Sequence, residues 1–328
     1  MTAGSPAAGG GPTAPAVHFV LGTGRCGSTL VHEVLSRHPD VGFVSNLDDK
    51  LPFPELLGRW NGPLYRFLPP SFAQKGRVRF APSEAYGILD RRVSPILSTP
   101  ARDLHAADAS PWVQRRLRRF FEDRARAQRS PVFLHKFTGW PRAGFLARVF
   151  PDARFVNVIR DGRAVASSWL QMPWWLGYGG PERWQWGPLP RPYAAEWESS
   201  GRSFVTLAAI AWKMLMDAYE ESRAELPGGQ WLDVRYEDFL ANPREELGRT
   251  LAFLGLAWTD PFERGFRRHV LDPGRRAAYL RDLDPAQVSE LERSLADHLV
   301  RYGYEAAPAA PRERSEASPA PAAASPGV

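Results

Sequence analysis

Short apolar runs alternate with segments of helical periodicity along most of the chain. Residues 17–21 form an apolar run that ends at glycines, which is typical of a buried strand. In residues 28–37, apolar side chains recur every three or four positions until His38 and Pro39, so a helix is expected there. The same reasoning predicts strands at 41–44, 131–134, 154–159 and 230–235. It predicts helices at 111–129, 142–150, 162–170, 204–225, 244–254 and 285–301.

The order of these elements indicates the fold class. Strands separated by helices of this length predict an α/β protein with a central parallel sheet covered by helices on both faces. We expect one folded domain at 17–304. Residues 1–16 and 305–328 are rich in small residues and proline without periodicity, so both tails are expected to be disordered. The weakly periodic segment at 50–130, proline-rich in its first part, is expected to be an insertion that shapes a substrate site.

The overall charge narrows the choice of partners only slightly. The 328 residues carry a formal net charge of +6, with Arg far outnumbering Lys. Such a charge is typical of proteins that bind nucleic acid, an anionic membrane or a polyphosphate-like ligand. The alternative is that the arginines only reflect compositional bias. No basic run is interleaved with aromatic residues, so nucleic acid is not the favoured partner. Cys26 is the one cysteine, which excludes an intramolecular disulfide and CxxC metal sites. With no apolar run of about 18 residues and no signal-peptide pattern, we expect a soluble cytoplasmic protein without a membrane partner.

A glycine-rich stretch at 22–29 separates the first strand from the first helix. Its glycines allow backbone N–H groups to converge on one point, and the helix N-terminus adds partial positive charge, so an anion site is expected. The spacing is that of a phosphate-binding P-loop, but Ser28 stands where nucleotide triphosphatases place a lysine. Kinase chemistry with Mg²⁺ needs that lysine. Here the positive charge comes from Arg25 instead.

Arg25-Cys26-Gly27-Ser28-Thr29-Leu30 resembles the 5′-phosphosulfate loop of the sulfotransferase family at every position. The resemblance implies that these six residues bind the sulfuryl donor 3′-phosphoadenosine-5′-phosphosulfate (PAPS). It also implies a P-loop-like three-layer sandwich. The alternative is a strand-to-helix turn that binds no ligand, although such a turn has no need for the arginine and the paired hydroxyls.

A second similar motif begins where the strand at 154–159 ends. Arg160 leaves the carboxyl end of that strand, where ligands bind in open α/β sheets. Ser168 follows about two helical turns later and can face the same way. In the sulfotransferase family, an arginine and a serine so placed hold the 3′-phosphate of PAPS, and the resemblance implies this role for Arg160 and Ser168. The alternative is that Arg160 merely pairs with Asp161.

Two further segments resemble the protein-tyrosine sulfotransferase branch of the family. Lys136 follows a strand, as the catalytic lysine of that branch does, and by this resemblance would stabilise charge on the bridging oxygen and the sulfuryl group. Residues 234–239 match the segment that places Tyr236 near the nucleotide. A solvated lysine and a buried structural tyrosine are the respective alternatives. The resemblance covers 17–304 and is weakest at 50–130.

The chain also departs from the family pattern. Asn46 stands where the protein-tyrosine branch carries its general-base glutamate, and a shift of two residues brings Asp48 to that place. Asp48 is therefore the candidate base, with a turn-capping role as the alternative. No histidine follows Lys136 as in the cytosolic branch. Near the C-terminus only 274–276 is basic and glycine-rich, so Arg276 is a candidate for the 3′-phosphate.

These observations predict a sulfotransferase that moves a sulfuryl group in line from PAPS to a hydroxyl or amine of an unidentified acceptor, without a metal. Arg25, Lys136 and Asp48 are the candidate catalytic residues. Tryptophans at 174–186 could form an aromatic platform for the acceptor or an ordinary self-packed lid. A P-loop small-molecule kinase and a non-catalytic nucleotide-binding protein on the same scaffold stay open as alternatives, and a homodimer is one option for the assembly.

Overall fold

A five-stranded parallel sheet forms the centre of the computed structural model, which describes residues 15–51, 58–68, 79–272 and 277–304. The strand order is β2-β3-β1-β4-β5. Every hydrogen-bonded pair in the sheet is parallel. The strands are β1 (Ala16–Gly22), β2 (Val41–Gly42), β3 (Val132–Lys136), β4 (Phe155–Ile159) and β5 (Trp231–Arg235).

Alternate residues of the strands contribute to two separate hydrophobic cores. Val20 and Val158 belong to the first core, whereas Phe19 and Phe155 belong to the second. Since side chains alternate between the two faces of a strand, the two cores lie on opposite faces of the sheet. This arrangement confirms the predicted three-layer α/β sandwich.

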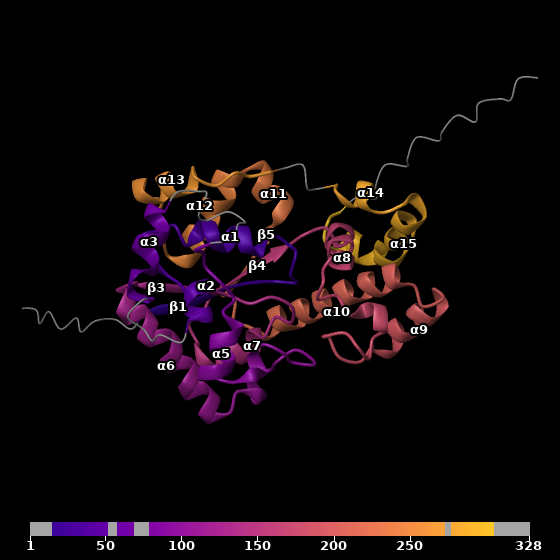
Figure 1. Cartoon of the computed structure of the whole chain (residues 1–328), viewed down its shortest axis with the longest axis horizontal. Coiled ribbons are helices and arrows are strands. Elements are labelled where there is room, and N and C mark those ends of the chain that lie inside the picture. The colour runs from indigo at the N-terminus through magenta and orange to yellow at the C-terminus, as the bar shows by residue number, and fades with distance from the viewer. Residues whose placement is uncertain (1–14, 52–57, 69–78, 273–276, 305–328) are drawn as a thin grey trace, which may run out of the picture.

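Helices cover both faces, as Figure 1 shows. The first core takes side chains from α1 (Ser28–Leu35), α8 (Gly162–Leu170), α10 (Phe204–Glu225), α11 (Tyr236–Ala241), α12 (Pro243–Leu254), α13 (Asp260–Phe266) and α15 (Pro285–Arg301). The second core takes them mainly from α5 (Tyr86–Arg92), α6 (Pro111–Gln128) and α7 (Ala143–Val149). The remaining described helices are α2 (Asn46–Lys50), α3 (Asn61–Phe67), α9 (Arg191–Ser199) and α14 (Tyr279–Asp282), with single 3₁₀ turns at Gly58–Trp60, Pro95–Leu97, Ala106–Asp108 and Gly177–Gly179.

Most of the predicted elements are confirmed within two residues at each end, and the differences have local causes. The second strand keeps only two paired residues, because the chain turns at its end into the capped helix α2. β1 begins at Ala16, inside the tail expected to be disordered, because Ala16 pairs with Val132. Residues 1–14 and 305–328 of the predicted tails lie outside the described residues. Seven short helices were not predicted individually, because short segments carry little periodicity: α2, α3, α5, α9, α11, α13 and α14.

The path of the chain creates a topological switch point beside β1. The chain leaves β1 toward β2 and β3 on one side, then crosses to β4 and β5 on the other. In open α/β sheets, the crevice at the carboxyl ends of the strands at such a point is where ligands bind. The loop at 22–29, Lys136, Arg160 and Tyr236 all stand at the carboxyl ends of strands, so the sheet itself brings them to one edge.

Candidate active site

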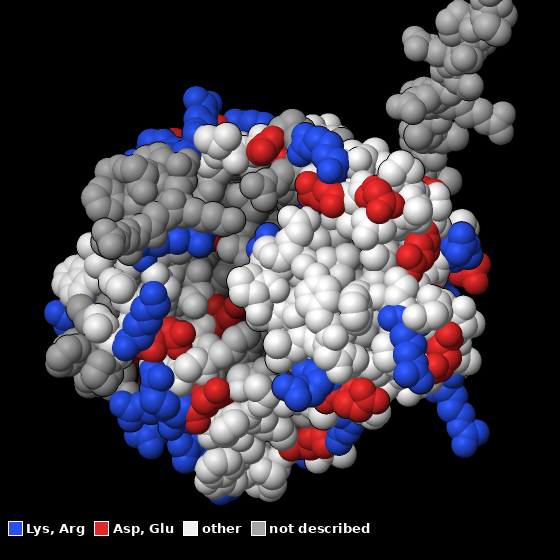
Figure 2. Space-filling model, turned by 45° about the vertical axis from the view of Figure 1, so that its right-hand side comes forward, with Lys and Arg blue, Asp and Glu red and all other residues white. Residues whose placement is uncertain are grey.

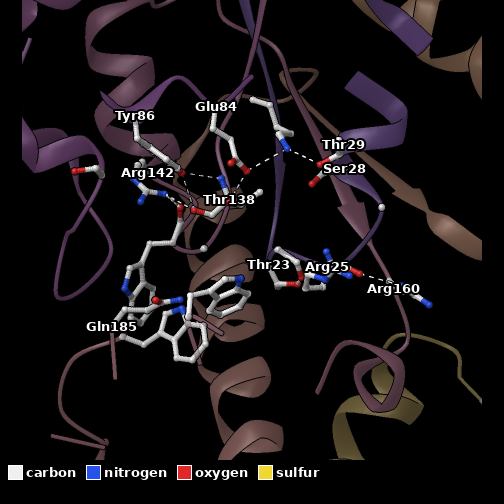
Figure 3. Close-up of a pocket in the computed structure, with 18 of the residues that line it drawn as sticks. Thr23, Arg25, Ser28, Thr29, Glu84, Tyr86, Thr138, Arg142, Arg160 and Gln185 are labelled. Atoms are coloured by element: carbon white, nitrogen blue, oxygen red, sulfur yellow. Dashed lines mark hydrogen bonds and ion pairs between the residues drawn. The ribbon is translucent and has the colours of Figure 1, made fainter. Parts of the chain in front are cut away.

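A cavity of about 780 Å³ opens at this edge of the sheet. This volume lies within the range of small-molecule sites. Its lining contains five basic residues (Arg25, Arg79, Lys136, Arg142 and Arg160) against two acidic ones (Glu33 and Glu84). Figure 3 shows Ser28, Thr29, Arg25 and Arg160 on one side of the cavity, and Glu84, Tyr86, Arg142 and Gln185 on the other. The excess of positive charge suits an anionic ligand.

The glycine-rich loop is held in a conformation that few sequences can adopt. Gly24, Arg25 and Gly27 have φ angles of 85°, 57° and 94°, all in the left-handed region. A Cβ atom at Gly27 would lie 2.2 Å from the ring of Tyr236, so the loop needs glycine there for space as well as for φ. Of the predicted loop residues 25–30, all except Cys26 line the cavity. The Cys26 side chain is instead buried in the first core, so only the backbone of Cys26 is available to a ligand.

The two predicted phosphate-binding motifs meet at this cavity. Arg25 Nε donates a hydrogen bond to Ser168 Oγ at 2.9 Å, although Ser168 itself does not line the cavity. Arg160 Nη1 donates to the carbonyl oxygen of Arg25 at 3.0 Å. The Arg160 guanidinium carbon lies 4.9 Å from the centroid of the Tyr236 ring. Segments about 140 residues apart in the sequence therefore form one cluster. Arg160 does not depend on Asp161 for this placement, because Asp161 caps α8 and pairs with Arg163 at 2.8 Å.

Lys136 lies at the centre of the cavity wall rather than in solvent. It is 4% exposed, and its ammonium donates to Thr29 Oγ1 at 2.6 Å. The same nitrogen lies 3.1 Å from Glu84 Oε1. Lys136 thus connects the glycine-rich loop on one side of the cavity to a carboxylate on the other.

Glu84 is a candidate functional residue that the sequence did not indicate. Its Oε1 also accepts a hydrogen bond from Thr138 Oγ1 at 2.8 Å. Burial alone would raise the pKa of Glu84, but Lys136 and the hydrogen bonds from Thr138 and Lys136 outweigh burial and hold this pKa below its ordinary value of 4.5. Glu84 is therefore ionised at neutral pH, as a group that accepts a proton must be. It lies in the weakly periodic part of the chain, and a bridge between Ser45 and Pro82 fixes its segment beside the end of β2.

The structure does not bring Asp48 to the cavity. One carboxylate oxygen of Asp48 accepts hydrogen bonds from Ser45 N at 2.8 Å, Ser45 Oγ at 2.8 Å and Asn61 Nδ2 at 2.6 Å. The bond from Ser45 N, together with a bond from Asp48 N to Ser45 Oγ at 3.2 Å, makes the capping box of α2. Asn46 also has a structural partner, because its Oδ1 accepts from the backbone N–H of Ala81 at 3.0 Å. The turn-capping alternative describes Asp48 better than the general-base hypothesis does.

Tryptophans form part of the cavity wall. Trp140, Trp174 and Trp186 line it together with Ser98, Thr99, Pro100 and Gln185. Trp186 is itself buried, with its ring centroid 4.8 Å from that of Trp169 and 5.4 Å from that of Trp184. The tryptophan-rich loop is thus packed by its own side chains, and two of its rings also face the cavity. Arg79, Ser98 and Thr99 come from the segment expected to shape a substrate site.

Comparison of the sequence with known protein families identifies the family of this chain. The profile described as the sulfotransferase family matches residues 18–260 of the chain. The chain belongs to the sulfotransferase family.

Individual members of the family are distant from this chain. The omega-hydroxy-beta-dihydromenaquinone-9 sulfotransferase Stf3 of Mycobacterium tuberculosis is 23% identical over 314 residues, which cover 88% of this chain and 75% of that protein. The sulfotransferase STF9 of Mycobacterium avium has a similar fold, with a TM-score of 0.50 and 14% identity over 89% of this chain and 78% of the other. The sulfotransferase domain of an olefin synthase from Synechococcus PCC 7002 gives a TM-score of 0.48 at 17% identity, over 89% and 96% of the two chains.

Two further predictions, the nucleotide contact by Arg276 and the absence of a membrane span, depend on which residues the structure describes. Arg276, the candidate C-terminal contact to the 3′-phosphate, lies outside them. None of the helices within the described ranges is long and apolar enough to cross a lipid bilayer.

Proposed function

We propose that this sulfotransferase uses PAPS as its donor, with the loop at 25–30 and Arg160 binding the two anionic ends of the nucleotide. The observation that carries the proposal is the shared cluster in which Arg160 donates to the Arg25 carbonyl and Arg25 donates to Ser168. The loop amides and the N-terminus of α1 suit the 5′-phosphosulfate. Arg160 and Ser168 suit the 3′-phosphate, because guanidinium–phosphate hydrogen bonds are charge-assisted and specific. Tyr236 supports both parts by packing against Gly27 and Arg160.

We infer that Lys136 and Glu84, which lie 3.1 Å apart at the cavity wall, assist the transfer. Bound PAPS supplies an activated sulfuryl group. Lys136, held by Thr29 beside the loop, stabilises the charge that develops on the bridging oxygen. Glu84 takes the proton of the acceptor hydroxyl. The acceptor oxygen forms a bond to sulfur as the bond between sulfur and the bridging phosphate oxygen breaks. The electron pair of the broken bond stays on the bridging oxygen, and the acceptor proton passes to the Glu84 carboxylate.

Glu84 makes the catalytic alternative stronger than the non-catalytic one. Its carboxylate, 3.1 Å from the ammonium of Lys136, is the counter-ion of a buried lysine and also supplies a proton acceptor at the cavity wall, which only the catalytic alternative uses. The kinase alternative is weakened because Ser28, at the position of the P-loop lysine, begins α1 and lies 2% exposed at the cavity wall. A cytoplasmic location and a homodimer stay predictions.

The direct test is transfer of ³⁵S from labelled PAPS to a panel of hydroxyl acceptors that includes phenols, sugars, linear alcohols and a menaquinone alcohol. The last is chosen because Stf3 is named for such an acceptor. We expect labelled product from at least one class, without added Mg²⁺, and a loss of about 10²–10³ in turnover for Lys136→Ala. Transfer of ³²P from Mg·ATP with none from PAPS would establish the kinase instead. Binding of the product nucleotide 3′,5′-adenosine bisphosphate (PAP) without transfer to any acceptor would establish the non-catalytic alternative.

A further inference from the structure

A group of exposed apolar side chains begins at Trp174, one of the tryptophans that line the cavity. Trp174, Leu176, Tyr178 and Phe204 are 39, 56, 53 and 42% exposed. We call these four residues the apolar track. Large apolar side chains gathered on a surface usually mark a place where another apolar molecule binds.

The apolar track is continuous with the cavity at one of its ends. Trp174 belongs to both, because it lines the cavity and is also partly exposed. Its ring lies 6.4 Å from that of Trp186, which lines the cavity as well. Leu176 and Tyr178 follow Trp174 along the same loop, and the Tyr178 ring lies 5.2 Å edge-on from that of Phe204. The track thus leads from the inside of the cavity onto the surface.

The residues of the track are fixed by their surroundings. The Tyr178 hydroxyl donates to the carbonyl oxygen of Leu170 at 2.7 Å. The 3₁₀ turn at Gly177–Gly179 packs against α10, whose first residue is Phe204. Beneath the loop, the Trp175 ring stacks on that of Trp169 at 6.3 Å. A surface held in this way can bind an apolar ligand with little additional ordering cost.

The cavity adds charged groups to the apolar surface of the track. Figure 2 shows the molecule hollowed near the middle of the view, with a broad area free of charged side chains to the right of the hollow. Inside the cavity, Lys136 and Glu84 provide the polar end. A ligand that fits both regions has a polar reactive group at one end and an apolar body at the other.

We propose that the acceptor is an alcohol at the end of an apolar chain, whose hydroxyl enters the cavity while the chain lies along the apolar track. This inference rests on the proposed function and adds the substrate class. Glu84 and Lys136 would receive the hydroxyl. Trp174 and Trp186 would pack against the first carbons of the chain, and Leu176, Tyr178 and Phe204 against the later ones. A small sugar or phenol would occupy the cavity alone and would leave the track unused.

Chain-length dependence of binding tests this inference separately from turnover. The probes are 1-alkanols of 4 to 12 carbons, titrated by calorimetry into the enzyme saturated with PAP. We expect the dissociation constant to fall about twofold per added methylene, which corresponds to burial of about half of each methylene. In the double variant Leu176→Ser/Tyr178→Ser, affinity should stop rising with chain length once the alkyl chain fills the cavity. Butanol should bind to the double variant as it binds to the wild type.

Trp112→Ser is the matched control, because Trp112 is 48% exposed at the start of α6 on the other face of the sheet. It should keep the full chain-length dependence. Equal affinity for all alkanols, or the same dependence in the double variant, would overturn the inference. The inference would also be overturned if alkanol affinity did not depend on chain length and the double variant instead weakened either self-association or binding to phosphatidylcholine vesicles. The track would then bind a second copy of the chain or a lipid surface. If PAP itself fails to bind, the proposed function fails, and the alkanol series on the free enzyme still decides the role of the track.

Discussion

At the scale of single residues, neighbours decide what each carboxylate does. Asp48 and Glu84 both lie near the end of β2, but Asp48 accepts three hydrogen bonds from Ser45 and Asn61. Glu84 faces the cavity and pairs with Lys136. Distance along the sequence favoured Asp48 as the base. The contacts in the structure favour Glu84.

Glu84→Gln and Asp48→Asn form a matched pair that separates these roles. Glu84→Gln keeps the shape of the side chain but removes the proton acceptor, so kcat should fall by about 10² or more. Asp48→Asn should leave kcat near the wild-type value and lower the free energy of unfolding by about 1 kcal/mol through loss of the capping box. Steady-state kinetics and urea denaturation check the two effects. The reverse pattern would restore Asp48 as the base.

The pH dependence of kcat/KM provides an independent check on Glu84. The pKa of Glu84 is lowered below 4.5, so its carboxylate stays ionised until the pH falls below that value. We expect no loss of kcat/KM assignable to this base between pH 7 and 5, and a decline only below pH 4.5. The measurement is a pH profile with circular dichroism at each point to confirm folding. A loss centred between pH 6 and 7 in folded enzyme would contradict the assignment.

At the scale of elements, the loop between β1 and α1 and the start of α11 are built to fit each other. Gly27 combines a φ of 94° with a ring of Tyr236 in the space that a Cβ would take. Gly229, in the turn before β5, has a φ of 86° with nothing within 4 Å of its added Cβ. Substitution of either glycine by a residue with a Cβ therefore strains the backbone to a similar degree, but only substitution of Gly27 also creates a steric clash.

Replacement of each glycine by alanine separates these costs. Gly27→Ala should displace Tyr236 or the loop and abolish the rise in melting temperature that PAP produces. Gly229→Ala should lower stability by about 1–2 kcal/mol, the cost of left-handed backbone for a residue with a Cβ, and keep the PAP response. Differential scanning fluorimetry with and without PAP gives both values. An unchanged PAP response in Gly27→Ala would show that the loop does not hold the nucleotide.

Elements with strong local patterns could be predicted, and those fixed by contacts between distant segments could not. The loop at 22–29, Lys136 and Arg160 follow buried strands, so a parallel sheet must place them at one edge. Glu84 and Thr138 meet through side-chain contacts 54 residues apart in the sequence, and no periodicity marks Glu84. The sequence left two roles open for Asp48 for a related reason, because an aspartate at this position can cap a helix or act as a base, and only its contacts in the structure favour the cap.

At the scale of the whole molecule, the core contains histidines that are neutral when folded. Burial lowers the pKa of His18 to about 4 and that of His32 to about 3. Burial, with a smaller contribution from His32, also lowers the pKa of His135 well below 6.5. As the pH falls below 6.5, the unfolded chain binds protons that the folded chain does not, so stability decreases. This acid sensitivity belongs to the fold and is separate from the chemistry of Glu84.

His135→Phe should reduce this acid sensitivity. The His135 ring packs at 4.7 Å from Phe137 and 5.0 Å from Phe121, so an aromatic replacement suits the site. One buried histidine that stays neutral when folded accounts for about 1.3 kcal/mol of stability lost between pH 7 and 5.5. The difference in unfolding free energy between pH 7 and 5.5, measured by urea denaturation, should be smaller by about this amount in the variant. Comparing each protein with itself cancels any packing cost, and an unchanged difference would contradict the explanation.

The account as a whole depends on one nucleotide contacting both the loop and Arg160. Calorimetric titration of PAP and 5′-AMP into the wild type, Arg160→Ala and Ser168→Ala tests this most directly. We predict that the wild type binds PAP about 10- to 100-fold more tightly than AMP, the worth of charge-assisted hydrogen bonds to the 3′-phosphate. Arg160→Ala should remove most of this preference, and Ser168→Ala part of it, with smaller effects on AMP. Equal affinity of the wild type for both nucleotides, or equal weakening of both by Arg160→Ala, would contradict the account.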